Sequence, residues 1–155
     1  MNTSRFHGWI WKSLVAGLCG TIASTLLMFL KIHAGWLPAF QPYQALQNTL
    51  SRLISSAVPP IVPWVISYLN GMTIVGLLFG SSYQLLPGKY GITKGIMVGI
   101  LVWLIMGLSF FPMLGLGLFA GDIGLGVKPA LFSLVMVLTY STVMGIVYAA
   151  LNAEA

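Results

Sequence analysis

Long uninterrupted apolar runs dominate the chain, and polar residues gather in the short segments between them. Four runs are long and apolar enough to cross a bilayer, over about residues 12–32, 61–86, 92–112 and 129–151. Their apolar positions do not alternate with polar ones, as the strands of a membrane β-barrel would. We therefore expect an all-α, polytopic membrane protein with four transmembrane helices in a single membrane domain, residues 1–155.

The segment between the first and second runs is too polar to cross a bilayer, but it has a helical pattern of its own. Over about residues 43–58, Leu46, Leu50 and Leu53 recur at helical spacing, with amides, serines and Arg52 opposite. Such a helix lies in the membrane interface or covers the end of the bundle. We expect one amphipathic interfacial helix here, acting either as a simple cap or as a lid over a cavity.

Small residues recur at every fourth position within the predicted helices, which keeps them on one helix face. In membranes such faces let neighbouring backbones approach closely. In the third helix the series is interrupted only by Trp103, which we expect to fill the gap beside the glycines. The positions predicted to pack in this way are Gly20, Gly76, Gly80, Gly91, Gly95, Gly99, Gly107, Ser141 and Gly145.

Charge is scarce, and this excludes several classes of protein. Charged residues make up 6% of the chain, whereas a soluble domain carries about 25%. The net charge of +5 is spread along the chain rather than gathered in the basic patch that nucleic-acid binding requires. We expect contact with anionic lipid headgroups and no nucleic-acid partner. Lys31 and Lys94 lie at helix ends, from which they can extend to the headgroups.

An even number of spans places both termini on one side of the membrane. The basic residues on that side are Arg5, Lys12, Lys89 and Lys94, and those on the other are Lys31, Arg52 and Lys128. The excess favours cytoplasmic termini. The first apolar run is longer than the core of a signal peptide, so we interpret it as a retained transmembrane helix.

Residues that commonly carry chemistry are few and scattered. No ionisable residue lies near the middle of a predicted span, where membrane enzymes and proton-coupled carriers keep them. His7 and His33 are predicted at opposite faces, and Cys19 is the single cysteine. We therefore expect no metal, no cofactor and no enzymatic activity.

Two polar residues form a possible polar site. Asn70, in the second span, is predicted to hydrogen-bond a neighbouring helix or to line a substrate pathway. Asp122 lies in a glycine-rich apolar segment, residues 115–126, that is expected at the membrane interface. It is predicted to bind loop amides or to pair with Lys128.

Several turn and packing motifs together have a familiar arrangement. They are Leu86-Pro87-Gly88, Lys94-Gly95, Gly99 with Trp103, Phe111-Pro112, the glycine-rich loop, and Gly145 with Tyr148. Over residues 12–150 the chain resembles a family of small uncharacterised four-helix proteins of the bacterial inner membrane, classed as a domain of unknown function. The resemblance implies a multi-pass protein of the bacterial inner (cytoplasmic) membrane. It implies no activity, so no site residue follows from it.

Three functions remain open from the sequence. The first is a non-catalytic accessory subunit of a larger membrane complex of respiratory or photosynthetic type, because the small-residue faces exceed what four helices need for one another. The second is a homo-oligomeric channel or carrier for a small neutral solute, lined by Ser67, Asn70, Tyr140 and Ser141. The third is a lipid-active membrane enzyme, which requires His33 and Asp122 in one pocket.

Overall fold

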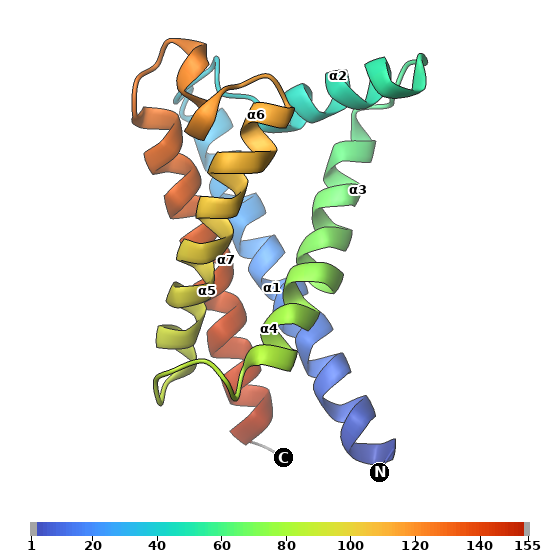
Figure 1. Ribbon diagram of the computed structural model, residues 1–155, viewed down its shortest axis with the longest axis vertical. Helices are drawn as coiled ribbons and strands as arrows, with labels where there is room; N and C mark the ends of the chain where they lie inside the picture. Colours follow the sequence, from blue (N-terminus) through green and yellow to red (C-terminus); the bar gives the residue numbers. More distant parts are fainter. Residues whose placement is uncertain (1–2, 154–155) are drawn as a thin grey trace.

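The computed structural model describes residues 3–153, and in this part of the chain it contains helices and turns but no strand. Four helical columns stand side by side, and shorter elements cover one end (Figure 1). The columns are α1 (Thr3–His33), α3–η1–α4 (Ile61–Leu69, Asn70–Val75, Gly76–Ser82), α5–η2–α6 (Gly91–Ile105, Met106–Phe110, Phe111–Met113) and α7 (Lys128–Ala153). The covering elements are α2 (Pro42–Ile54) and the 3₁₀-helix η3 (Leu118–Ile123).

Each column contains a stretch long and apolar enough to cross a membrane. These spans are Gly8–His33, Ile61–Ser82, Gly91–Met113 and Lys128–Ala153. The all-α fold with four spanning helices is therefore confirmed, and the chain is a multi-pass membrane protein. Large apolar side chains on the outside, among them Ile74, Leu78, Leu101 and Leu131, are exposed as lipid-facing residues should be.

Several helix boundaries differ from those expected, and one of them is the end of the second span, which lies at Ser82 rather than near residue 86. The first helix begins at Thr3 rather than near residue 12, because the polar lead continues the helix. The amphipathic helix α2 ends at Ile54 rather than near residue 58. Ser55 turns the backbone into the left-handed region, with φ of 53°, and two prolines then prevent helix from continuing.

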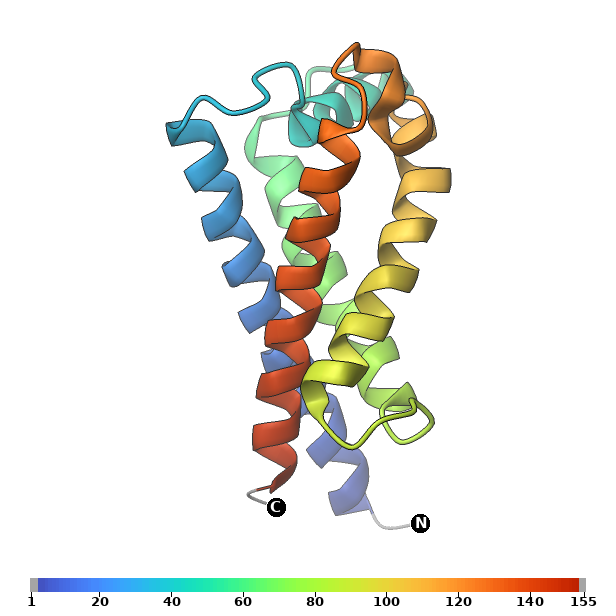
Figure 2. The same ribbon diagram turned by 90° about the vertical axis from the view of Figure 1, so that its left-hand side faces the viewer.

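The columns α1 and α7 form the centre of the packing. Helix α7 lies against α1 on one side and α5 on the other, and α1 also contacts η1 and α4. The start of α1 and the end of α7 lie at the same end of the bundle, opposite α2 and η3 (Figures 1 and 2). This is the arrangement that an even number of spans requires.

Both the second and third spans contain a turn of π-helix. In η1 the Gly76 N–H reaches back to the Gly71 carbonyl, and in η2 the Phe111 N–H reaches back to Met106. Pro112 follows directly and has no N–H to donate, so the turn before it widens and the helix ends at Met113. The helix thus ends one residue after the proline.

Two apolar clusters hold the bundle together. The first lies between the columns and consists of Ala16, Phe79, Tyr140, Met144 and Tyr148. The second lies beneath α2 and η3, the elements that cover one end of the bundle and that we call the cap. It consists of Phe40, Phe111, Leu114, Leu116 and Ala120. The glycine-rich segment contributes to the second cluster, so it packs onto the end of the bundle beside α2 (Figure 2).

Candidate functional site

The glycines of α5 face α7 at backbone distance. A Cβ atom added to Gly91 would overlap the Gly145 carbonyl, and one added to Gly95 or Gly99 would overlap Ser141. The reciprocal overlap occurs for Gly145 against Gly91. The absence of side chains therefore allows these two helices to touch directly.

The second small-residue face joins α1 to the second span. A Cβ atom on Gly76 would lie 2.8 Å from the Ser13 carbonyl oxygen, and one on Gly80 would overlap the Ser13 hydroxyl. A Cβ on Gly20 would lie 2.5 Å from the Tyr140 carbonyl oxygen, so Gly20 faces α7. These predicted positions therefore pack within the described chain.

Sequence reasoning missed one contact of this kind. A Cβ atom on Gly17 would lie 2.5 Å from the Gly71 carbonyl oxygen, so α1 and η1 are in backbone contact here. Ser13, Gly17 and Thr21 are themselves spaced by four. That spacing was the available signal, and it marks a face of α1 adjacent to the one containing Gly20.

Gly107 differs from the other glycines of its helix. The space beside it is filled by the ring of Phe119, from the cap, rather than by another helix backbone. Trp103 lies against the same ring, with centroids 4.7 Å apart and the ring planes tilted by 46°. Its indole N–H donates to the Ala130 carbonyl at 3.2 Å and the Ser133 hydroxyl at 3.1 Å. Trp103 therefore fixes α5 to the start of α7 as well as filling space.

Asn70 points out of the bundle. It is exposed, and its carboxamide makes no hydrogen bond within residues 3–153. The expected hydrogen bond to a neighbouring helix of the same chain is therefore not made. Asn70 stands at the beginning of η1, near the middle of the second span.

Asp122 lies in the cap and is exposed. Its carboxylate packs against Gly117, whose φ of 77° is of the kind that glycine adopts easily. The Asp122 N–H donates to the Leu116 carbonyl at 3.1 Å. The described side chains show no ion pair between Asp122 and Lys128, and neither Asp122 nor His33 lines the two pockets described below.

Lys31 and Lys94 do not extend to the surface as expected. Their exposed fractions are 3% and 8%. The Lys31 ammonium donates to the Phe40 carbonyl, and that of Lys94 donates to the Tyr83 carbonyl at 2.6 Å while lying 4.1 Å from the Tyr83 ring centroid. Each lysine ties a helix to the connecting segment at one end of the bundle.

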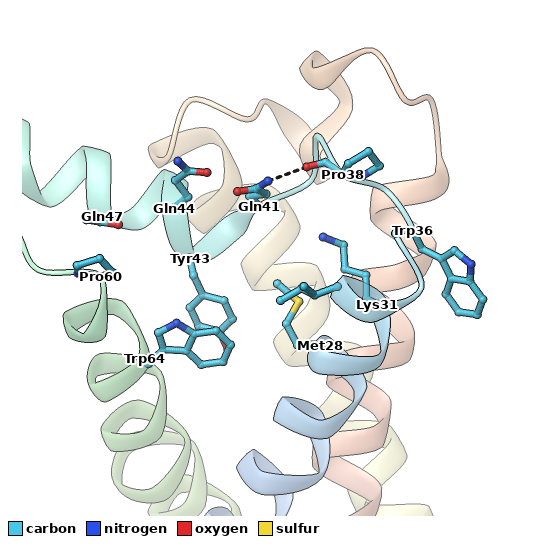
Figure 3. Close-up of a pocket in the computed structure, with 12 residues that line it drawn as sticks. Met28, Lys31, Trp36, Pro38, Gln41, Tyr43, Gln44, Gln47, Pro60 and Trp64 are labelled. Atoms are coloured by element: carbon cyan, nitrogen blue, oxygen red, sulfur yellow. Dashed lines mark hydrogen bonds between the residues drawn. The ribbon is translucent and has the colours of Figure 1, made fainter.

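Of the two pockets described, the larger lies beneath α2 (Figure 3). Helices α1 and α3 diverge at this end of the bundle (Figure 1). We call this larger pocket the α2 pocket, and its volume is ≈ 530 Å³. It is lined by Met28, Lys31, Ile32, Gly35, Trp36, Pro38, Gln41, Tyr43, Gln44, Gln47, Pro60 and Trp64. Helix α2 thus roofs a cavity, as the lid alternative requires.

The rings of Tyr43 and Trp64 form one side of the α2 pocket. Tyr43 stacks on Trp64 with centroids 4.0 Å apart, and Trp64 stacks on Phe29 at 5.8 Å. The Tyr43 hydroxyl lies 3.2 Å from the Ser67 hydroxyl. Burial raises the pKa of the Tyr43 phenol, although its hydrogen bond with Ser67 acts in the opposite direction.

The second pocket is a shallow groove on the outside of α4, of ≈ 390 Å³. It is lined by Trp9, Thr73, Ile74, Leu77, Leu78 and Ser81. We call it the α4 groove. It follows Asn70 along the same helix, because its residues on the second span lie three, four, seven, eight and eleven positions after Asn70.

The four residues proposed to line a pore have separate surroundings. The Tyr140 hydroxyl donates to the Gly71 carbonyl, the Ser141 hydroxyl to the Leu138 carbonyl, and Ser67 pairs with Tyr43. None of these three residues lines the α2 pocket or the α4 groove, and neither does Asn70, the fourth. The structure does not bring them together around one of these cavities.

Comparison with known proteins gives a family but no function. No curated protein and no solved structure matches the chain. A family model described as "Family of unknown function (DUF6789)" matches residues 8–155, which include all four spans. The expectation of a family of unknown function, drawn from the turn and packing motifs, is therefore confirmed. The chain belongs to this family of unknown function, DUF6789.

Proposed function

We propose that this protein is a non-catalytic subunit of a larger membrane complex, and that it binds its partner through the outward face of the second span. The observation that carries the proposal is Asn70, a carboxamide exposed near the middle of that span without a hydrogen bond in the described chain. A polar group without a partner is costly in hydrocarbon. A polar side chain on an adjacent transmembrane helix would satisfy it.

The α4 groove supports the same face. The Thr73 hydroxyl donates to the Leu69 carbonyl at 2.5 Å and the Ser81 hydroxyl to the Leu78 carbonyl at 3.0 Å, so both polar groups are satisfied by their own helix. Ile74 and Leu78 are exposed between them. The groove is therefore an apolar seat for the side chains of a partner helix, with Asn70 as the polar contact at one end.

The small-residue faces no longer support this proposal, because they are occupied within the chain. The proposal rests on Asn70 instead. A carboxamide has both donors and an acceptor, so two copies of this chain could also pair through Asn70. A homo-oligomer is accordingly one result that the experiment below distinguishes from a hetero-complex.

We further propose the bacterial inner membrane, with both termini in the cytoplasm. The basic residues near the terminal end are Arg5, Lys12, Lys89 and Lys94, against Lys31, Arg52 and Lys128 at the end covered by α2 and η3. This excess of one basic residue, with the positive-inside rule, supports the orientation.

The test is a mild-detergent extraction from cells that express the protein naturally, followed by native gel electrophoresis and mass spectrometry. We expect co-migration with other membrane-protein subunits in fixed stoichiometry. Asn70→Leu should release the chain from the complex, since it removes the polar contact and retains a lipid-compatible surface. Thr139→Val is the matched control, because Thr139 lies on α7 outside the α4 groove and its hydroxyl donates to the Val135 carbonyl of its own helix.

Two results would contradict the proposal. One is a wild-type chain that migrates alone, as a single small species. The other is an Asn70→Leu variant that stays in the complex as firmly as wild type. A complex made only of this chain and dissolved by Asn70→Leu would replace the accessory subunit with a homo-oligomer.

A further inference from the structure

The α2 pocket lies at the depth where two spans end. Lys31 is in the last turn of the first span, which ends at His33, and Pro60 immediately precedes the second span, which begins at Ile61. Helix α2 runs across this end of the bundle (Figure 1). The pocket is therefore placed at the boundary between hydrocarbon and headgroups, where an amphiphile has its polar and apolar parts.

The lining of the α2 pocket likewise has a polar part and an apolar part. The polar groups are Lys31 and three glutamines, Gln41, Gln44 and Gln47, and the glutamines all come from α2 or the residue before it. The apolar part is formed by Met28 and Ile32 of α1 and the Tyr43–Trp64 stack. Figure 3 shows Met28 and Lys31 on one side of the space and the Tyr43–Trp64 pair on the other.

Lys31 supplies an uncompensated positive charge. It is 97% buried, by its exposed fraction of 3%, and the acceptor of its hydrogen bond is the uncharged Phe40 carbonyl. An ammonium has three N–H donors, so this bond leaves two of them for other acceptors. No carboxylate of the described residues lies in an ion pair with it, and a buried charge is costly unless paired. A ligand with an anionic oxygen would accept hydrogen bonds from the remaining N–H donors and would also neutralise the charge of Lys31.

We propose that the α2 pocket binds one anionic phospholipid. Its phosphate lies against Lys31 and the α2 glutamines, and the first part of an acyl chain lies over Met28 and Trp64. Charge complementarity with Lys31 selects an anionic headgroup over a zwitterionic one. The site is separate from the outward face at Asn70, so it stands or fails independently of partner binding.

Native mass spectrometry of the purified full-length chain tests the site. The chain is equilibrated in detergent with equal amounts of phosphatidylglycerol and phosphatidylcholine, and the two retained adducts are compared. We expect a preference for phosphatidylglycerol of about fivefold, the effect of one lysine near an anionic surface. An excess of inorganic phosphate should leave the adduct in place, because a free anion lacks the acyl chain.

Four variants make the test specific. Lys31→Met should abolish the preference and Lys31→Arg should keep it. Arg52→Gln is the matched control, since Arg52 is a basic residue of α2 that does not line the pocket. Gln44→Trp keeps the charge but fills the pocket from an exposed position without a described hydrogen bond, so it should lower retention even if Lys31→Met fails to fold.

Several outcomes would overturn the proposal. They are a wild-type chain without a headgroup preference, equal retention by wild type and Gln44→Trp, and a loss in Arg52→Gln as large as that in Lys31→Met. Displacement of the adduct by inorganic phosphate would identify a free-anion site instead. A folded Lys31→Met variant that still prefers phosphatidylglycerol would also exclude Lys31 as the headgroup contact.

Discussion

The Tyr140 hydroxyl donates a hydrogen bond of 2.6 Å to the carbonyl of Gly71, a residue 69 positions earlier in the chain. The same carbonyl accepts the Gly76 N–H that closes the π-helical turn. A Cβ atom on Gly71 would overlap the Thr21 hydroxyl of α1. Three of the four columns therefore meet at this carbonyl, and the bond fixes their relative rotation near the middle of the bundle.

Replacing Tyr140 with phenylalanine tests that bond. The variant keeps the ring and loses the hydroxyl, so the Gly71 carbonyl keeps only its backbone partner. We expect a loss of about 1 kcal/mol in the free energy of unfolding, measured by thermal or denaturant unfolding in detergent. Tyr90→Phe is the matched control, because Tyr90 is 73% exposed. Equal stability of the two variants would show that the bond does not contribute.

The contact between α5 and α7 predicts a strong effect at Gly95. Gly95→Ala adds a Cβ atom that overlaps the Ser141 backbone, so the helices must separate. We expect a loss of about 1–3 kcal/mol in unfolding free energy, measured in the same way. Gly8→Ala is the control, since Gly8 is helical and nothing lies within 4 Å of its added Cβ. A Gly95→Ala variant as stable as Gly8→Ala would contradict the close packing.

Lys94 is predicted to stabilise the turn between the second and third spans. Lys94→Met removes the donor to the Tyr83 carbonyl and the cation above the Tyr83 ring. The expected cost is about 1–3 kcal/mol, that of leaving a part-buried acceptor unpaired, with faster limited proteolysis of residues 83–90. Lys89→Met, at an exposed lysine of the same turn, should change neither measurement. An unchanged proteolysis rate in Lys94→Met would refute this role.

The raised pKa of Tyr43 predicts that the folded protein loses stability at alkaline pH. Because burial raises its pKa in the folded state, the folded protein holds a proton that the unfolded chain releases above the ordinary value of 10.0. Stability therefore falls as pH rises through and above that value, and below it this contribution is constant. Thermal unfolding as a function of pH should show a shallower alkaline decrease for Tyr43→Phe than for wild type. Parallel curves would contradict the assignment, and Tyr90→Phe is again the control.

Local patterns in the sequence were enough to predict the fold class and the number of spans. Apolar length is a local property, and each of the four runs is long enough to require a spanning helix whatever surrounds it. Pro112 likewise determined the end of its helix, because a missing N–H acts locally. The amphipathic pattern identified α2, although not its last turn.

The directions in which the polar and small residues face depend on the tertiary packing. Gly107 shares its spacing with Gly95 but accommodates Phe119. Lys31 turns inward to the Phe40 carbonyl, and Asn70 turns outward. Within an apolar span, one helix face differs little from another in hydrophobicity, so the rotation of each helix depends on the summed packing of all its neighbours. Those packing contacts are between residues far apart in the chain, so they cannot be predicted from a local sequence pattern.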